Sequence, residues 1–114
     1  MKIDKGLMSG STTLLVLSLL RGGDMYGYEM IEELSRRSSD AFQLKEGTLY
    51  PILHTLEKEK CLTSYRREAS TGRERKYYHI TKKGLQLLEE KQQEWEFFSG
   101  RVNDVLSGGS HALA

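Results

Sequence analysis

Cationic side chains are concentrated in one stretch near the middle of this sequence. Five of them fall between positions 66 and 76, where only Glu68 and Glu74 oppose them: Arg66, Arg67, Arg73, Arg75 and Lys76. Guanidinium and ammonium groups neutralise phosphates, so this spacing is typical of a surface that binds a nucleic-acid backbone. The net charge of the 114-residue chain is only +1. A nucleic-acid role therefore requires that the acidic residues lie on another part of the molecule.

Acidic side chains gather in a separate segment toward the C-terminus. Four of them lie close together there: Glu89, Glu90, Glu94 and Glu96. We expect them to form a solvated helix face at a distance from any bound nucleic acid. A nearly neutral protein that binds nucleic acid needs this division into a basic and an acidic part.

The residue groups that carry enzyme chemistry are missing from the sequence. The single cysteine, Cys61, excludes an internal disulfide, and His54, His79 and His111 do not have the spacing of zinc ligands. No Ser/His/Asp order, paired carboxylates or phosphate-cradling glycine loop is present. We therefore expect no catalytic residues, no metal and no cofactor, and we expect Cys61 to be a small buried hydrophobic residue.

Composition indicates a folded domain of ordinary size. Hydrophobic residues make up 38% and charged residues 29% of the chain, a balance that argues against disorder. The longest apolar stretch, Leu14 to Leu20, is interrupted by Ser18 and is far too short to span a membrane. Since no signal peptide precedes it, we expect a cytoplasmic protein without a membrane partner.

The basic stretch is predicted to be a β-hairpin. Residues 62–67 and 75–80 are rich in Tyr, Thr and Ile, and the turn-forming residues 68–74 separate them. Alternation places Tyr78 and Ile80 on one face of the second strand, with Tyr77 and His79 on the other. We expect both tyrosines to be structural.

Three helices are predicted before the hairpin, over about 11–21, 26–37 and 46–60. The third has an apolar stripe at three- and four-residue spacing, formed by Leu49, Ile52, Leu53 and Leu56. Proline lacks an N–H and is tolerated best in the first turn, so Pro51 predicts a start near Gly47 or Thr48. The first helix is apolar nearly all round, which places it in a core or in a dimer interface.

A long last helix is predicted from the N-cap Thr81 to about Leu106. At 1.5 Å per residue it would be about 39 Å long, more than a domain of this size can cover by itself. Its apolar residues recur at heptad-like intervals, which indicates a seam that faces a partner. Together with the first helix it predicts a homodimer interface made of Leu14, Leu17, Leu85, Leu88, Trp95, Val102 and Leu106.

The order of elements predicts the fold class: mainly α with a small antiparallel hairpin, arranged as a winged helix-turn-helix with a long C-terminal dimerisation helix. Residues 1–80 would form the DNA-binding domain with its wing at about 62–80, residues 81–107 the dimerisation helix, and residues 108–114 a flexible tail. The major groove of DNA is about 12 Å wide and admits one helix, here the third, with the wing on adjacent phosphates. The predicted contacts to double-stranded DNA are Lys45, Thr48, Tyr50, His54, Arg66, Arg67, Arg73, Arg75 and Lys76.

Three motifs in order resemble those of PadR-type transcriptional regulators. Glu46-Gly47-Thr48-Leu49-Tyr50-Pro51-Ile52-Leu53, followed by Leu56-Glu57-Lys58-Glu59, resembles the recognition helix of that family. Gly72-Arg73-Glu74-Arg75-Lys76-Tyr77-Tyr78-His79-Ile80-Thr81 resembles its wing, and Tyr26-Gly27-Tyr28-Glu29 is similar to the start of its second helix. The match extends from about Thr13 to Leu106, and the length is that of the short subfamily, which has one C-terminal dimerisation helix.

The resemblance implies a homodimer that represses transcription from palindrome-like operators and is released by a signal. Some short members of the family bind flat aromatic compounds at the dimer interface, where a tryptophan of the last helix stacks on the ligand. Trp95 is the matching residue, and Phe98 lies close to it. The sequence departs from the family where the recognition helix ends, because Lys60 replaces the usual glycine. Lysine in a left-handed conformation there would cost about 1 kcal/mol.

Several residues keep a second interpretation. Trp95 is either a packing anchor of the dimer core or a platform for a planar aromatic ligand. Tyr50 could pack against its own domain instead of contacting DNA, and His54 could be a solvated surface residue. For the whole chain, the competing hypothesis is a winged helix that contacts another protein, since fold alone does not determine function.

Overall fold

A computed structural model describes residues 3–108 of the chain. Its helices are α1 (Lys5–Ser9), α2 (Thr12–Arg21), α3 (Gly27–Arg37), α4 (Glu46–Lys58) and α5 (Lys82–Leu106), and its strands are β1 (Met25–Tyr26), β2 (Leu62–Glu68) and β3 (Glu74–Ile80). The flexible tail expected at 108–114 lies outside the described residues except for Gly108, and so does His111.

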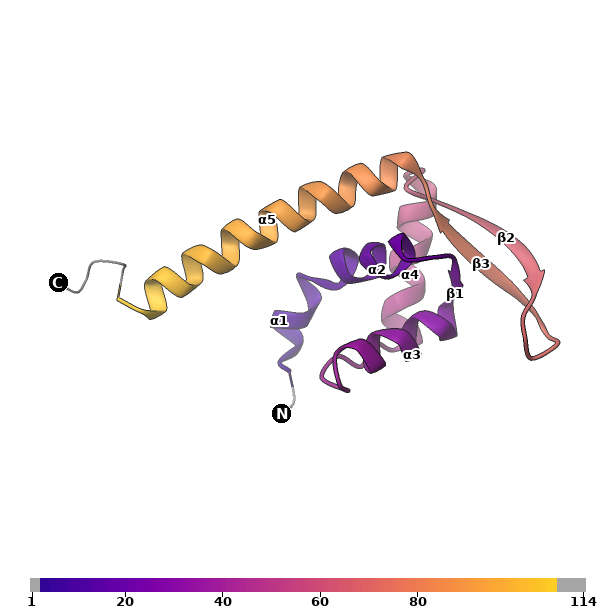
Figure 1. Cartoon of the computed structure of the whole chain (residues 1–114), viewed down its shortest axis with the longest axis horizontal. Coiled ribbons are helices and arrows are strands. Elements are labelled where there is room, and N and C mark those ends of the chain that lie inside the picture. The colour runs from indigo at the N-terminus through magenta and orange to yellow at the C-terminus, as the bar shows by residue number, and fades with distance from the viewer. Residues whose placement is uncertain (1–2, 109–114) are drawn as a thin grey trace.

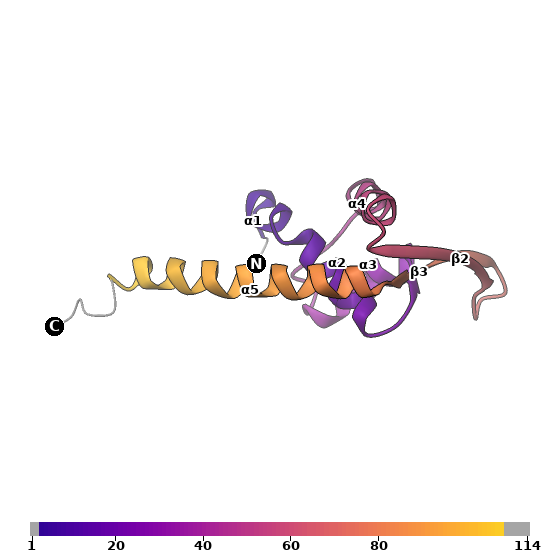
Figure 2. The ribbon, with the colours of Figure 1, turned by 90° about the horizontal axis from the view of Figure 1, so that it is seen from above.

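The elements form a body with two extensions that point in opposite directions (Figure 1). Helices α2, α3 and α4 make up the body, the β2–β3 hairpin leaves it at one end, and the C-terminal part of α5 extends past α1 at the other. The view from above shows the hairpin and α5 nearly in line (Figure 2). The principal extents are 62 × 31 × 21 Å. This arrangement is the predicted winged helix with a long C-terminal helix.

The core lies between α2, α3, α4 and the base of the hairpin. Its fully covered side chains come from all of these elements, and the largest are Leu17, Leu19, Leu20, Met30, Leu49, Leu53 and Leu62. Tyr78 and Ile80 join the same cluster from β3, as alternation predicts. Cys61 is 2% exposed in this core, which confirms its prediction as a small buried hydrophobic residue.

Helix α4 begins at Glu46, the first residue of the predicted range and one or two residues before the start that Pro51 indicates, so Pro51 lies beyond the first turn of the helix. Proline cannot donate to the carbonyl four residues back, which here belongs to Gly47. Both Gly47 and Pro51 are exposed, so water can solvate that carbonyl. The missing bond is therefore tolerated where a buried one would be costly.

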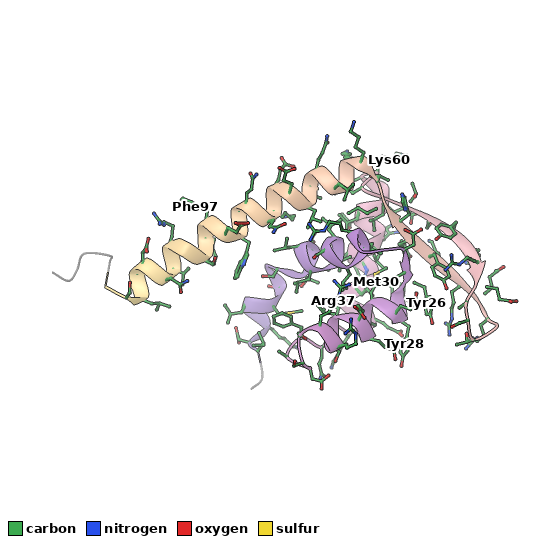
Figure 3. The ribbon with its side chains drawn as sticks, viewed as in Figure 1. Tyr26, Tyr28, Met30, Arg37, Lys60 and Phe97 are labelled. Carbon is green, nitrogen blue, oxygen red and sulfur yellow. The ribbon has the colours of Figure 1, made fainter. Side chains whose placement is uncertain are left out.

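Two residues after the end of α4, Lys60 has the left-handed conformation that glycine normally adopts. Its φ is 69°, and two hydrogen bonds close the end of the helix: Lys60 N–H to the Glu57 carbonyl at 3.0 Å and Cys61 N–H to the Leu56 carbonyl at 2.9 Å. These are the two bonds of a Schellman motif. Lys60 lies beside the base of the hairpin and the start of α5 (Figure 3). The glycine geometry is thus retained without the glycine.

Helix α5 begins where the sequence predicts. The Thr81 hydroxyl accepts from Gly84 N–H at 3.1 Å and donates to the Lys60 carbonyl at 2.8 Å, so it joins the end of α4 to the start of α5. A Cβ on Gly84 would stand 2.2 Å from the Cys61 carbonyl oxygen. The first turn of α5 therefore approaches the α4–β2 connection as closely as only glycine permits.

Two short elements were not predicted from the sequence. Helix α1 has only 5 residues, with Asp4 as its cap. Strand β1 has 2 residues, and it pairs Met25 with Tyr78 and Tyr26 with Tyr77. It makes the hairpin a three-stranded sheet of order β1-β3-β2. Neither element is long enough to show a periodicity in the sequence.

Candidate nucleic-acid interface

The outer face of α4 carries the side chains that were predicted to meet DNA. Thr48, Tyr50 and His54 are exposed, whereas Leu49, Leu53 and Leu56 are buried beneath them. Lys45, the residue before the helix, is exposed as well. One face of α4 is therefore fixed by the core, and the opposite face is free to enter a groove.

Tyr50 combines packing with exposure. Its side chain lies against the first turn of α3, because a Cβ on Gly27 would stand 2.3 Å from its hydroxyl oxygen. The residue is nevertheless 42% exposed. Partial burial, reinforced by the nearby Glu46 carboxylate, raises the pKa of Tyr50 above its usual value. The phenol therefore stays protonated and can donate a hydrogen bond.

A cleft of about 350 Å³ separates the starts of α3 and α4 from the wing. Four of the predicted DNA-binding residues line it: Tyr50, Arg66, Arg75 and Lys76. Glu46 and Glu74 also line it, so its charge is mixed. The Arg75 Nε atom is buried and has no hydrogen-bond partner among the described residues. The structure thus brings three of the five wing cations and Tyr50 of the recognition helix to one cleft, which Arg67 and Arg73 do not line.

The register of the hairpin divides the wing cations between two faces. Arg66 pairs with Lys76, and Arg67 pairs with Arg75 one position further out. Arg67 lies 4.1 Å from the centre of the Tyr77 ring, and Arg75 lies 5.1 Å from that of Tyr26. These are cation–π distances. Arg67 and Arg75 therefore cover an aromatic cluster as well as adding positive charge.

The cluster under these arginines contains one tyrosine from each strand. Tyr77 is 3% exposed, stacks on Tyr65 with 5.7 Å between ring centres, and meets Tyr26 edge-on at 5.4 Å. Tyr77 and Tyr78 are thus both structural, as predicted, although they face opposite sides of the sheet.

The remaining wing cations differ in how far they are neutralised. Lys76 Nζ lies 3.6 Å from a Glu57 carboxylate oxygen, and Arg66 lies 3.9 Å from Glu74. Arg73 is exposed in the loop between the strands, and it forms no ion pair or cation–π contact within residues 3–108. It is the wing cation most available to an external phosphate.

Two carboxylates that sequence reasoning did not single out hold the wing in place. Glu57 on α4 accepts a hydrogen bond from the Ser64 hydroxyl and pairs with Lys76. Asp24 accepts from the Tyr65 hydroxyl at 2.6 Å and lies 2.8 Å from His79 Nδ1. Partial burial alone would raise the pKa of Asp24, but the hydrogen bonds from Tyr65 and His79 outweigh it and lower that pKa. Separations of 41 and 55 residues hide these contacts from any local pattern.

Four of the apolar residues predicted for the seam are exposed on α5. Leu85, Trp95, Val102 and Leu106 are 42, 47, 37 and 78% exposed. Phe97, which the seam did not include, is 69% exposed and lies on the part of α5 that extends past the body (Figure 3). Leu14, on α2, is partly buried.

Leu17 and Leu88 correct the predicted dimer interface. Leu17 is 0% and Leu88 2% exposed within the single chain, because α2 packs directly on the first half of α5. A second copy would find no surface of these two side chains to cover. The apolar character of α2 thus reflects the core of one protomer.

Trp95 and Phe98 line a mostly apolar cavity of about 610 Å³ between α5, α1 and Phe42. Their ring centres are 6.3 Å apart. Leu7, Met8 and Leu14 contribute to its apolar wall, and Lys91 and Glu94 are the charged residues that line it. The two residues predicted for ligand binding therefore share one cavity.

The described part of the chain contains neither a metal-binding cluster nor a membrane-spanning helix. Residues 3–108 contain no cluster of three His, Cys, Asp or Glu side chains able to hold a metal ion. No helix in the same range is long and apolar enough to cross a membrane.

Comparison with known proteins agrees with this geometry. The model of the PadR-like family of transcriptional regulators matches residues 16–90. The transcriptional regulator Rv3488 of Mycobacterium tuberculosis is 34% identical over 98 residues, which cover 86% of this chain and 85% of that protein. A PadR-like regulator from Bacillus cereus is 35% identical, with a TM-score of 0.78 over 90% of this chain and 97% of that one. A PadR family regulator from Clostridium difficile is 39% identical, with a TM-score of 0.70 over 84% and 98%.

The matched residues run from α2 through α4 and the wing to the first half of α5. They account for more than half of the chain and contain every predicted DNA-binding residue. The family consists of regulators and not of enzymes. The chain belongs to the PadR-like family of DNA-binding transcriptional regulators.

Proposed function

We propose that the protein is a homodimeric repressor that acts in the cytoplasm on a palindrome-like operator. The observation that carries this proposal is the exposed face of α4 beside a wing with five cations. Thr48, Tyr50 and His54 would reach base edges or phosphates in the major groove, with Lys45 at the start of the helix. Arg73 and its neighbours would bind the flanking phosphates.

The second part of the proposal is that α5 pairs two copies of the chain. Six large apolar side chains of α5 between Trp95 and Leu106 are 37–78% exposed, which is unusual on a helix that remains alone in water. A second copy of the same helix would cover them in a symmetric contact. Two wings and two α4 helices would then read two half-sites.

The third part is a planar aromatic effector. The cavity of about 610 Å³ at Trp95 and Phe98 is large enough for such a molecule. Aromatic rings would stack on Trp95, and binding next to the dimer contact would change the spacing of the two readers. The other interpretation of Trp95 is a packing anchor between protomers. It is supported by the same exposed side chain, which a second copy could cover instead of a ligand.

Selection of binding sites from a random pool of duplexes, with the mass of the purified protein measured in parallel, tests the proposal. An inverted repeat with half-sites about one helical turn apart, or a multiple of it, together with a dimer mass, is the expected result. No enrichment and weak binding even at low salt would overturn it. That outcome would favour the alternative of a protein-binding winged helix, whose affinity for DNA lacks the steep salt dependence of phosphate contacts.

A further inference from the structure

The wing is held on both faces by carboxylates, and each carboxylate contacts both strands. On one face Glu57 accepts from Ser64 on β2 and pairs with Lys76 on β3. On the other face Asp24 accepts from Tyr65 on β2 and contacts His79 on β3. Asp24 lies in the link between α2 and β1, so the second contact joins the wing to an element outside both the hairpin and the recognition helix.

This second contact reaches Tyr65 at the outer limit of the three-stranded part of the sheet, where Tyr65 pairs with Tyr77 and Tyr77 with Tyr26. Beyond that level the hairpin is a two-stranded ribbon, which has little stability of its own. β1 supports β3 only at Tyr77 and Tyr78, and the strands continue from there to Glu68 and Glu74 without a third strand. From Tyr65 to Glu68 the ribbon extends about 10 Å further. A small rotation at the level of Tyr65 would therefore move Arg73 by several ångströms relative to α4.

We propose that Asp24 is a positioning residue for DNA binding: by holding Tyr65 and His79 it sets the angle of the wing to α4. This inference rests on the proposed function, because it assumes that the wing and α4 bind one duplex. Asp24 itself does not touch the DNA in this arrangement. It acts through the two strands that carry the wing cations.

The sign of the effect separates positioning from simple electrostatics. Removing an anion from a DNA-binding protein normally strengthens its attraction to phosphates. Positioning predicts the opposite for Asp24→Ala, a weakening of about tenfold. Glu68→Gln is the matched control, because Glu68 is an exposed wing carboxylate without an ion pair or side-chain hydrogen bond within residues 3–108. It should bind as tightly as the wild type or more tightly.

The experiment measures operator affinity and its salt slope for the full-length wild type, Asp24→Ala, Arg73→Ala and the double variant. Tyr65→Phe is added because it removes only the hydroxyl that donates a hydrogen bond to Asp24 and retains the ring that stacks on Tyr77. If circular dichroism shows that Asp24→Ala does not fold, the Tyr65→Phe variant tests the same contact. Asp24→Ala should make the slope shallower by about 0.9, the loss of one phosphate contact. In the Asp24→Ala background, Arg73→Ala should weaken operator binding less than it does in the wild-type protein.

The outcomes distinguish this inference from the proposed function. If Arg73→Ala weakens wild-type binding while Asp24→Ala and Tyr65→Phe leave affinity and slope unchanged, the positioning role is wrong and the proposed function stands. If Arg73→Ala has no effect and the protein shows no salt-dependent DNA binding, the proposed function fails, and this inference fails with it. A merely stabilising Asp24 would lower the melting temperature without changing the salt slope of the folded protein.

Discussion

The phenol of Tyr50 lies against the backbone of Gly27, so closely that a Cβ on Gly27 would stand 2.3 Å from the tyrosine oxygen and 2.7 Å from the ring carbon that bears it. The first turn of α3 thereby supports an exposed aromatic side chain of α4. Two motifs that are more than twenty positions apart in the sequence, one around Gly27 and one around Tyr50, meet at this contact.

Gly27→Ala should therefore displace Tyr50 and weaken DNA binding. No Cβ fits at 2.3 Å, and the tyrosine side chain can move more easily than the α3 backbone. Loss of one well-placed contact predicts about a tenfold rise in Kd. Fluorescence anisotropy with labelled operator measures it. Gly10→Ala is the control, since a Cβ there would meet nothing within 4 Å. An unchanged Kd for Gly27→Ala would show that Tyr50 does not contact DNA from this position.

Arg73→Ala should weaken binding to every duplex, not only to the operator. Arg73 is exposed in the loop of the wing, where it would meet phosphates that carry no sequence information. The slope of log K against log salt should become shallower by about 0.9. Arg101→Ala, which removes a cation from α5, should leave both affinity and slope as they are. His54→Ala, by contrast, should change the preferred sequence or have no effect.

Lys60→Gly should stabilise the protein, although glycine usually destabilises. The φ of Lys60 is 69°, a conformation in which a Cβ costs about 1 kcal/mol. Urea unfolding should therefore show a gain of up to about 1 kcal/mol. Lys58→Gly, a change two residues earlier at the last residue of α4, should instead cost up to about 1 kcal/mol. A loss of stability in Lys60→Gly would mean that the lysine side chain makes a stabilising contact larger than its backbone strain.

Glu33 should contribute to the stability of the fold in a way that depends on pH. Hydrogen bonds from Arg36 and Arg37 lower the pKa of Glu33 from 4.5 to about 2. A lowered carboxylate pKa stabilises the fold above the unfolded value and loses that contribution as pH falls through the folded value. Glu33→Gln should therefore be less stable than wild type at pH 6–7. The difference in stability between Glu33→Gln and wild type should begin to shrink below about pH 4.5 and disappear near pH 2.

Denaturation midpoints at several pH values measure this difference. Glu32→Gln is the control on the same helix, because Glu32 forms no ion pair within the described residues. The effect should be small and should shrink with added salt, since Glu33 and its partners lie at the surface. A gap between Glu33→Gln and wild type that stays constant from pH 7 to pH 2 would contradict the assignment.

Local patterns predicted most of the fold and a large part of the candidate site. The leucine spacing of α4, the alternation in β3 and the cap at Thr81 each depend on neighbours within a few residues. Pro51 was misleading about the start of α4, because the cost of its missing hydrogen bond depends on exposure to water. Asp24 was not foreseen at all, because its contacts depend on how the α2–β1 link folds onto the wing.

The dimer interface shows the same limit in another form. Apolar periodicity predicts that a helix face is buried. It does not tell whether the same protomer or a second copy covers that face. Leu17 and Leu88 have the pattern expected of an interface and are covered within one protomer, whereas Phe97, off the heptad positions, is 69% exposed. Only the packing of α2 on α5 separates the part of the helix that belongs to the body from the part that remains free.

Trp95→Ala separates the two roles of this residue. Trp95 is 47% exposed and lines the apolar cavity with Phe98, so it can serve a ligand, a partner protomer or both. If it is a ligand platform, the variant should stay dimeric in sedimentation, bind operator as wild type does, and no longer be released by planar aromatic compounds. Phe97→Ala is the matched control, because Phe97 is exposed on the same helix and does not line the cavity.

The contrary result for Trp95→Ala is equally informative. A monomeric variant with weak operator binding would assign Trp95 to the dimer core, because large buried aromatics contribute several kcal/mol to an interface. In the proposed dimer, operator binding depends on pairing two half-sites, so affinity and dimerisation should then fall together. If wild-type protein is itself not released from DNA by any planar aromatic compound, the effector proposal is wrong whatever the variant does, and the cavity of about 610 Å³ has another role.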